Sequence, residues 1–173
     1  MKNNSITLIG MAGSGKSAIG EILAKMLNWQ FVDLDKLILE KNGITHHQIM
    51  EKNGAEELTR LENEYTLDLD FANLIFSPPG SIIYSPSAME KITKNSIIVY
   101  LQTDPAIVEK RLGERLYQNG IVGLKEKGLK KLMEERAVLY QKYADFTFHS
   151  NEQTKQEMVE IVLSGLKKAN AIL

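Results

Sequence analysis

The segment at 10–17, which reads G-M-A-G-S-G-K-S, constrains the fold of this chain more than any other segment. It fits the pattern G-x-x-x-x-G-K-[ST] at every fixed position, with the apolar run Ile6–Ile9 before it and the helical pattern Ala18–Leu27 after it. Glycines let the backbone curl so that several N–H groups converge on phosphate oxygens, and the N-terminus of the next helix adds a positive dipole end. The segment therefore predicts a phosphate-binding loop between a buried strand and a helix.

Individual residues of this loop are expected to bind ATP and Mg²⁺. Lys16 is expected to reach the β- and γ-phosphates, and the hydroxyl of Ser17 to be a Mg²⁺ ligand. The alternative interpretation is a glycine-rich turn that binds nothing. The residues expected to surround the phosphates are Gly10, Met11, Ala12, Gly13, Ser14, Gly15, Lys16, Ser17 and Ala18.

Five apolar runs predict the strands of one sheet. They are continuous rather than alternating, which is typical of a sheet covered by helices on both faces. Helical patterns separate them, and alternating strands and helices imply a parallel α/β sheet with right-handed crossovers. The predicted strands are Ile6–Ile9, Phe31–Val32, Leu74–Phe76, Ile97–Leu101 and, more weakly, Phe146–Phe148; the predicted helices include Ala18–Leu27, Ala55–Leu69, one starting at Ser85-Pro86, Pro105–Leu116, Leu129–Tyr143 and Thr154–Ala169.

Length and composition exclude several classes of protein. The 173 residues suffice for one domain with a sizeable core, and neither a repeat nor a linker divides residues 1–173. Lys and Arg number 21 against 22 Asp and Glu, so the bulk charge favours neither a nucleic-acid nor an anionic-membrane partner. The chain has no cysteine, which excludes disulfides and thiolate chemistry and fits a reducing compartment. With no signal-peptide pattern and no run of about 18 apolar residues, we expect a cytoplasmic protein. We also expect a monomer.

The phosphate-binding loop alone does not distinguish a GTPase, an ATPase, a nucleotide kinase and a small-molecule kinase. A GTPase normally also carries a base-reading Asn-Lys-x-Asp segment, and the nearest approach here, "TKNS" at 93–96, has no Asp. The absence of a second domain at this length favours a small kinase.

Two carboxylates follow the second predicted strand in the segment "FVDLD". Asp33 and Asp35 would lie at the carboxyl edge of the sheet, where open α/β sheets bind their ligands. If the segment stays extended, both side chains point the same way. One can then hold Mg²⁺, directly or through water, while the other orients the acceptor hydroxyl and takes its proton. The alternative is that Asp35 merely caps a helix that starts near Lys36.

These motifs, taken in order, resemble those of the shikimate kinase family over nearly the whole chain. "GITHHQIMEKNGAEELTRLE" at 43–62 is similar to the family's Gly-x-Ser-Ile and Gly-Glu-x-x-Phe-Arg-x-x-Glu segments, and "ERAVLYQKYAD" at 135–145 to its Arg-x-Pro-Leu-Tyr…Ala-Asp stretch. The resemblance implies a three-layer P-loop kinase fold with a five-stranded parallel sheet, an ATP/Mg²⁺ site, a small-molecule hydroxyl acceptor and a mobile lid at about 113–125.

The resemblance also implies a role for each matching residue. Lys16 and Ser17 would serve phosphate and metal, and Asp33 would belong to the metal shell. Asp35 would hold and activate the acceptor hydroxyl, and with Lys16 it would form the catalytic pair. The remaining implied contacts are Arg115 with the adenine, Arg136 with an acceptor carboxylate, and Glu62 and Gly80 with the acceptor pocket.

The acceptor half of the chain departs from the family pattern in three places. Thr59 stands where the family has the Arg of Gly-Glu-x-x-Phe-Arg, with Arg60 one position later; Val122 stands at about the position of a lid Arg; and Pro78-Pro79-Gly80 replaces Gly-Gly-Gly. Each lost charge-assisted contact to a carboxylate costs about 1.5–3 kcal/mol. Proline supplies no N–H, so only Gly80 and Ser81 remain as backbone donors there.

The sequence therefore predicts an ATP-dependent, Mg²⁺-requiring kinase of a small metabolite with a rebuilt acceptor pocket. One alternative is a nucleotide-binding module that has lost transferase activity. Another is shikimate itself, bound through shifted contacts from Arg60 and Arg136.

A pair of histidines, His46 and His47, lies in a polar segment at a helix start. Adjacent side chains on a helix diverge, so they do not converge on a metal. We expect a solvated pair without a role in the site.

Overall fold

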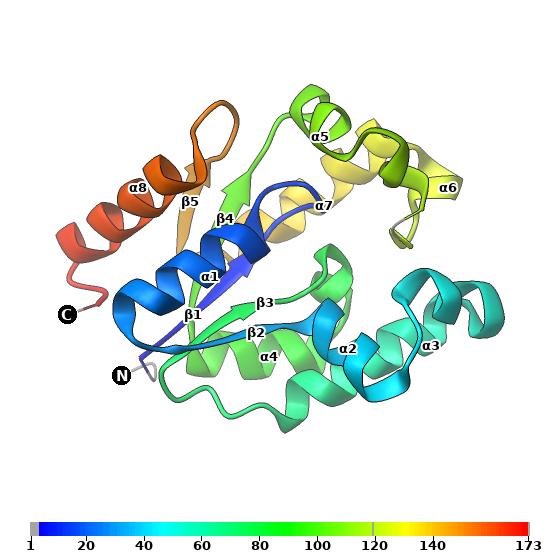
Figure 1. Ribbon diagram of the computed structural model, residues 1–173, viewed down its shortest axis with the longest axis horizontal. Helices are drawn as coiled ribbons and strands as arrows, with labels where there is room; N and C mark the ends of the chain where they lie inside the picture. Colours follow the sequence, from blue (N-terminus) through cyan, green and yellow to red (C-terminus); the bar gives the residue numbers. More distant parts are fainter. Residues whose placement is uncertain (1–3, 119, 173) are drawn as a thin grey trace.

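The computed structural model describes residues 4–118 and 120–172, and its centre is a five-stranded sheet (Figure 1). Every neighbouring pair of strands is parallel, in the order β2-β3-β1-β4-β5. The prediction of a parallel α/β sheet is confirmed, and each of the five predicted runs lies in a strand. The strands are β1 (Ser5–Ile9), β2 (Gln30–Asp33), β3 (Leu74–Ser77), β4 (Ile97–Gln102) and β5 (Phe146–His149).

Helices cover both faces of this sheet, which gives three layers (Figure 1). On one face pack α1 (Lys16–Leu27) and α8 (Lys155–Lys168), and on the other α4 (Pro86–Asn95) and α7 (Leu129–Tyr143). Beside α4 lies α3 (His46–Asp68). The remaining elements are α2 (Leu34–Asn42), α5 (Pro105–Leu112), α6 (Leu124–Lys127) and the 3₁₀ helices η1 (Gly80–Tyr84) and η2 (Gly113–Tyr117). Within the described part of the chain, no helix has the length and apolar character needed to cross a membrane.

The central strands are buried on both faces, and this explains their continuous apolar runs. Along β4, Ile98 and Tyr100 join the core under α4 and α7, whereas Val99 and Leu101 join the core under α1 and α8. Alternate residues of a strand point to opposite faces, so a strand between two helix layers is apolar at every position.

The carboxyl ends of β1, β2 and β3 bring three connections to one edge of the sheet. The phosphate-binding loop follows β1, α2 follows β2, and Pro78-Pro79 with η1 follow β3. As the two prolines predict, β3 ends at Ser77. Parallel strands therefore place residues far apart in the sequence around one site.

Two helices differ from their predicted bounds by more than two residues. The helix predicted at Ala55–Leu69 belongs to α3, which already begins at His46 and is interrupted at Gly54, where φ is 85°. The helix predicted at Pro105–Leu116 leaves the α conformation after Leu112 and continues as η2, because Gly113 has φ 52°. In both places a glycine in the left-handed region breaks the regular helix that the apolar pattern alone indicates.

A close helix–strand contact gives a first prediction. A Cβ built on Gly20 of α1 would lie 2.6 Å from Cε2 of Phe31. Although alanine favours helices over glycine by about 1 kcal/mol, we expect Gly20→Ala to lower the free energy of unfolding by about 1–3 kcal/mol, because the ring must shift. Urea denaturation measures the difference. Adding Phe31→Leu should recover part of the loss relative to Phe31→Leu alone, and a more stable Gly20→Ala protein would contradict this account.

Candidate active site

The phosphate-binding loop has the curled backbone that its glycines predict. Gly10, Gly13 and Gly15 have φ values of 145°, 79° and 98°. The Ser14 hydroxyl is buried without a hydrogen-bond partner, and no side chain caps α1 at Gly15. A buried hydroxyl and the free N–H groups of a helix start are donors that a phosphate can accept from. The loop of this chain therefore fits the phosphates of ATP.

Lys16 lies at the bottom of the loop, with 8% of its surface exposed. Its Nζ donates to the carbonyl oxygens of Gly10 (2.9 Å) and Met11 (3.0 Å). Burial lowers the pKa of Lys16 to about 8, and the negative charges of Asp35 and Asp33 oppose this decrease. Phosphate oxygens would provide the stronger counter-charge that this ammonium lacks.

Asp33, the predicted Mg²⁺ ligand, is the last residue of β2 and the N-cap of α2. Its Oδ1 accepts from the Lys36 N–H at 3.2 Å. The alternative in which Asp35 caps this helix is therefore wrong, since the cap is Asp33. The assumption of an extended segment is also wrong, because Asp35 lies in the first turn of α2.

The metal site would combine the Asp33 carboxylate with the Ser17 hydroxyl, at the start of α1. Among the described residues, no three His, Cys, Asp or Glu side chains gather in a metal cage. Mg²⁺ at nucleotide sites is usually held by one or two protein oxygens, phosphate oxygens and water. The chemistry of this donor pair fits such a site, and the two assignments stay predictions.

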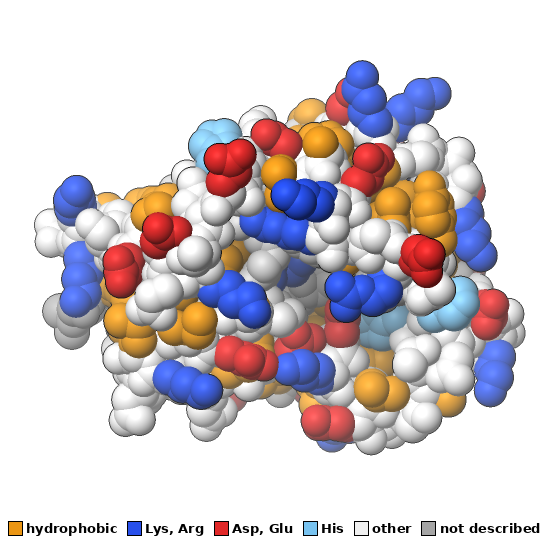
Figure 2. Space-filling view, turned by 45° about the horizontal axis from the view of Figure 1, so that its top comes forward, with side chains coloured by type: hydrophobic (Ala, Val, Ile, Leu, Met, Phe, Trp, Pro, Cys, Tyr) orange, Lys and Arg blue, Asp and Glu red, His pale blue; other side chains and the backbone are white. Residues whose placement is uncertain are grey.

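A cavity of about 460 Å³ opens beside the phosphate-binding loop. Figure 2 shows a hollow near the centre of this face, with Lys and Arg side chains around it and histidine side chains towards its right edge. Residues 118, 120, 121 and 122 of the predicted lid contribute to its wall, and residue 119 lies outside the described residues. The charged and polar residues used below are Lys16, Asp35, His46, Glu62, Gly80 and Arg136, which all line this cavity.

Asp35 opens into the cavity, where its side chain is 60% exposed. The surrounding protein raises the pKa of its carboxyl, and the neighbouring Asp33 adds to this increase. His46 and Lys16 oppose it. The position beside Lys16 suits a carboxylate that orients an acceptor hydroxyl and takes its proton.

Glu62 projects from α3 and is completely buried. The Ser81 hydroxyl lies 2.9 Å from each of its two carboxylate oxygens and donates to them. Burial raises the pKa of Glu62 to about 8, although Ser81 and the charge of Arg136 lower it. Burial thus favours the neutral form of this carboxyl, which lines the cavity. The contact of Glu62 with an acceptor stays a prediction.

Arg136 of α7 is 1% exposed. Its Nη2 donates to the carbonyl oxygen of Val122 at 2.8 Å, and its guanidinium lies 5.4 Å from the centre of the Tyr84 ring. Its Nε has no partner, and no carboxylate of the described residues forms an ion pair with it. A buried guanidinium without a carboxylate partner can bind an anion that enters the cavity.

Gly80 allows Arg136 to lie against the turn after β3. A Cβ on Gly80 would be 2.8 Å from Nη1 of Arg136 and 2.8 Å from the hydroxyl of Tyr140. That hydroxyl donates to the carbonyl oxygen of Gly80 at 2.8 Å. The third glycine of the family's Gly-Gly-Gly is thus retained where a side chain would displace the arginine.

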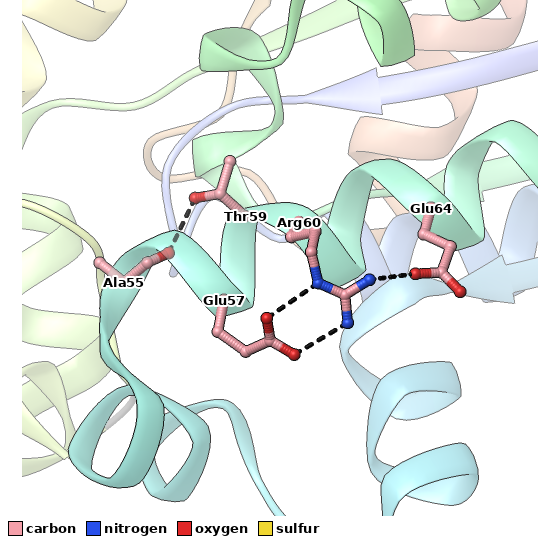
Figure 3. A network of polar contacts seen from close by, with 5 residues as sticks. All are labelled: Ala55, Glu57, Thr59, Arg60 and Glu64. Atoms are coloured by element: carbon pink, nitrogen blue, oxygen red, sulfur yellow. Dashed lines mark hydrogen bonds and ion pairs between the residues drawn. The ribbon is translucent and has the colours of Figure 1, made fainter.

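Arg60 is not among the described residues that line the cavity. Figure 3 shows its guanidinium between Glu57 and Glu64. Its guanidinium is paired with Glu57 at 2.8 Å and with Glu64 at 2.5 Å, and 58% of its side chain is exposed. Thr59 donates to the carbonyl oxygen of Ala55 at 3.0 Å. The prediction that Arg60 contacts the acceptor is corrected by this arrangement, because successive helix residues point about 100° apart.

Arg115, expected at the adenine, is exposed and donates to the carbonyl oxygen of Arg111 at 3.3 Å. Arg111, by contrast, contacts the phosphate-binding loop, because it donates to the carbonyl oxygen of Gly13 at 3.1 Å. It also donates to the carbonyl oxygen of Asn151 at 2.6 Å. Sequence reasoning missed Arg111, whose only signal is its place four residues before Arg115 on the same helical stretch. The adenine contact of Arg115 stays a prediction.

The two histidines diverge, as expected, but only one of them is solvated. His47 pairs with Glu51 at 3.3 Å, whereas the side chain of His46 is 11% exposed and its Nδ1 lies 3.1 Å from Oδ1 of Asp35. The expectation of a solvated pair is therefore wrong for His46.

The arrangement combines a phosphate-binding loop, a carboxylate beside its lysine and an acceptor cavity with a buried arginine, on a sheet of order 2-3-1-4-5. These features define a P-loop kinase that acts on small molecules.

A family model described as shikimate kinase matches residues 12–167, and the chain belongs to the shikimate kinase family. The shikimate kinase of Sulfurihydrogenibium sp. is 34% identical over 169 residues, which cover 97% of this chain and 99% of that protein. The shikimate kinase of Caldanaerobacter subterraneus is 29% identical over 171 residues, which cover 97% and 98%. The solved structure of Acinetobacter baumannii shikimate kinase in complex with shikimate has a TM-score of 0.85 and 27% identity, covering 98% of this chain and 95% of that chain.

The chain therefore transfers a phosphoryl group from ATP, with Mg²⁺, to a hydroxyl of a small metabolite. A nucleotide-binding module without transferase activity is not favoured, because the relatives match over their full length and the phosphate-binding loop is intact.

The buried carboxyl of Glu62 gives a prediction about stability and pH. Its pKa is about 8 in the folded chain against about 4.5 otherwise, so between these values the folded state binds more protons. The free energy of unfolding then falls as the pH rises. From pH 5 to pH 8 we expect wild type to lose roughly 2–4 kcal/mol more stability than Glu62→Gln, which cannot ionise.

Thermal unfolding across this pH range measures the difference between the two proteins. Glu56→Gln, an exposed change on the same helix, is the control and should follow the wild-type curve. Parallel curves for wild type and Glu62→Gln would show that Glu62 is already ionised in the folded chain.

Proposed function

We propose that the hydroxyl acceptor is a cyclic hydroxy acid of the shikimate type. Arg136 would bind its carboxylate, and Asp35 its reacting hydroxyl. The observation that carries this proposal is the buried guanidinium of Arg136, which lines the cavity and forms no ion pair with the described residues. A buried cation without a counter-ion costs stability, and a bound carboxylate would supply the missing charge.

The residues of the cavity have distinct tasks in the transfer. Asp35 orients the acceptor hydroxyl and takes its proton as the acceptor oxygen bonds to the γ-phosphorus. The bond from that phosphorus to the bridging oxygen breaks, and its electron pair leaves with ADP. Lys16, Ser17 and Asp33 bind the phosphates and the metal, and bound Mg²⁺ neutralises the charge that develops.

The altered residues predict weak binding of shikimate rather than its loss. Thr59 and Val122 remove two charge-assisted contacts of about 1.5–3 kcal/mol each. Arg60 cannot replace the first, because it is paired on the outer face of α3. We therefore expect a KM for shikimate in the millimolar range.

The chain is proposed to act as a cytoplasmic monomer. The absence of cysteine fits a reducing compartment. Sedimentation equilibrium of the full chain measures the oligomeric state, and a stable dimer would contradict this part of the proposal.

The acceptor is tested by a panel of compounds. Release of ADP is measured with ATP, Mg²⁺ and either shikimate, quinate, gluconate or glycerol, and the phosphorylated product is identified by mass spectrometry. We expect turnover with shikimate at millimolar concentration and little with glycerol, which has no carboxylate for Arg136. Turnover with glycerol but not with the acids would overturn the acceptor class while leaving the kinase activity in place.

The assigned roles are tested by variants. Asp35→Asn should lower kcat by about 10²–10⁴-fold, since general-base catalysis contributes this much. Arg136→Lys and Arg136→Met should raise the KM for the acid roughly 10- to 100-fold, with the KM for ATP unchanged. Thermal unfolding of each variant controls for folding. Wild-type kcat in Asp35→Asn would defeat its proposed role.

A further inference from the structure

His46 brings a buried imidazole against the predicted catalytic carboxylate. Its Nδ1 lies 3.1 Å from Oδ1 of Asp35, and only 11% of its side chain is exposed. The two residues come from different helices, since Asp35 is in the first turn of α2 and His46 is the first residue of α3. This contact therefore joins the starts of two elements at the wall of the acceptor cavity.

The start of α3 is held in place by its own hydrogen bonds. Thr45 is the N-cap: its side chain accepts from the backbone N–H of Gln48, and its own N–H donates to Oε1 of Gln48 at 2.8 Å. This capping box fixes the direction in which residue 46 leaves the helix. The imidazole is consequently presented to Asp35 by a rigid element.

The predicted lid touches the same helix start. A Cβ built on Gly120 would lie 2.9 Å from the backbone nitrogen of His47 and 3.1 Å from the carbonyl carbon of His46. Gly120 also has a φ of 61°. The backbone of the predicted lid thus lies directly against the peptide bond between His46 and His47.

Burying an imidazole at this position costs free energy that an apolar side chain would not. The Nε2 of His46 is buried without a hydrogen-bond partner, and such an atom loses its contact with water without compensation. In the Gly-x-Ser-Ile segment to which residues 43–46 are similar, the corresponding residue is aliphatic. An isoleucine would fill the space without the unpaired nitrogen, so packing alone does not account for the histidine.

We propose that His46 is a positioning residue that holds the Asp35 carboxylate for phosphoryl transfer. Nδ1–H donates to Oδ1, which leaves Oδ2 to meet the acceptor hydroxyl. The Asp35 side chain is 60% exposed at the start of a short helix, and without the contact to His46 it could adopt several rotamers. Fixing one of them avoids a misalignment that can reduce the rate of transfer about 100-fold.

This inference rests on the proposed role of Asp35, and the experiment separates the two. His46→Ile restores the aliphatic side chain, His46→Asn keeps an N–H near the position of Nδ1, and Lys52→Ala is an exposed control on the same helix. Each is made in the full chain, alone and together with Asp35→Asn. Steady-state and single-turnover kinetics are measured with the best acceptor of the panel, and thermal unfolding is measured for every variant.

We expect His46→Ile to lower kcat about 10- to 100-fold, with the KM for ATP within about twofold and the Tm unchanged or higher. His46→Asn should recover most of the rate, and Lys52→Ala should behave as wild type. A purely structural histidine predicts instead a lower Tm and no recovery by asparagine. In the Asp35→Asn background the effect of His46→Ile should disappear, because residues that act through one another are not additive.

Imidazole NMR gives a readout that needs no acceptor. The chain has three histidines, so the ring nitrogens of His46 can be assigned by comparison with His46→Ile. We expect a proton on Nδ1 in wild type and its loss or exchange broadening in Asp35→Asn. An unprotonated Nδ1, or a full effect of His46→Ile in the Asp35→Asn background, would overturn the inference alone; wild-type kcat in Asp35→Asn would overturn the proposed function.

Discussion

Four ionisable side chains are buried around one edge of the sheet, and none of them forms an ion pair with another. Lys16, Asp33, Glu62 and Arg136 are each at most 8% exposed. Lys16 donates to carbonyl oxygens, Asp33 accepts from a helix N–H, Glu62 accepts from a hydroxyl and Arg136 donates to a lid carbonyl. Burying charges in this way costs free energy that the surrounding core must offset. The phosphates of ATP supply negative charge beside Lys16, and the anionic acceptor of the proposed function would supply it beside Arg136.

The sheet is covered by helices on both faces, and its hydrophobic cores offset the free-energy cost of burying these charges. Its two cores, between the sheet and α1 and α8 on one side and α4 and α7 on the other, bury β1 and β3 along their whole length and the middle of β4. The loop after β1 holds glycines with positive φ and an unpaired hydroxyl. Gly15 with φ 98°, the unpaired Ser14 hydroxyl and the unpaired Nε of Arg136 all lie on this edge or face the cavity beside it.

Sequence reasoning could recover the features that local pattern determines. Continuous apolar runs located the strands, the glycine pattern located the phosphate-binding loop, and the amphipathic pattern gave α7 with its bounds. It could not recover which way single residues point. Asp35 was expected on an extended segment, but the Asp33 side chain starts a helix and rotates Asp35 into the cavity. His46 resembled a solvated residue, because nothing in its sequence neighbours reveals that its side chain is only 11% exposed and lies against Asp35 of α2. Arg60 lies one residue after Thr59, and the rotation of about 100° between successive helix residues places its side chain between Glu57 and Glu64.

The departures of the acceptor half from the family pattern also change the charge of the pocket. Thr59 removes a positive charge that the family pattern would place near Glu62. Glu62 accepts from a neutral donor, Ser81, and burial raises the pKa of its carboxyl to about 8. With Val122 at about the position of the lid arginine, the pocket has two fewer positive charges than the family pattern. In the proposed function, Arg136 is then the principal anchor for the acceptor carboxylate. Selectivity among hydroxy acids would accordingly depend on this one guanidinium and on the carboxylate of Asp35, which His46 contacts at 3.1 Å.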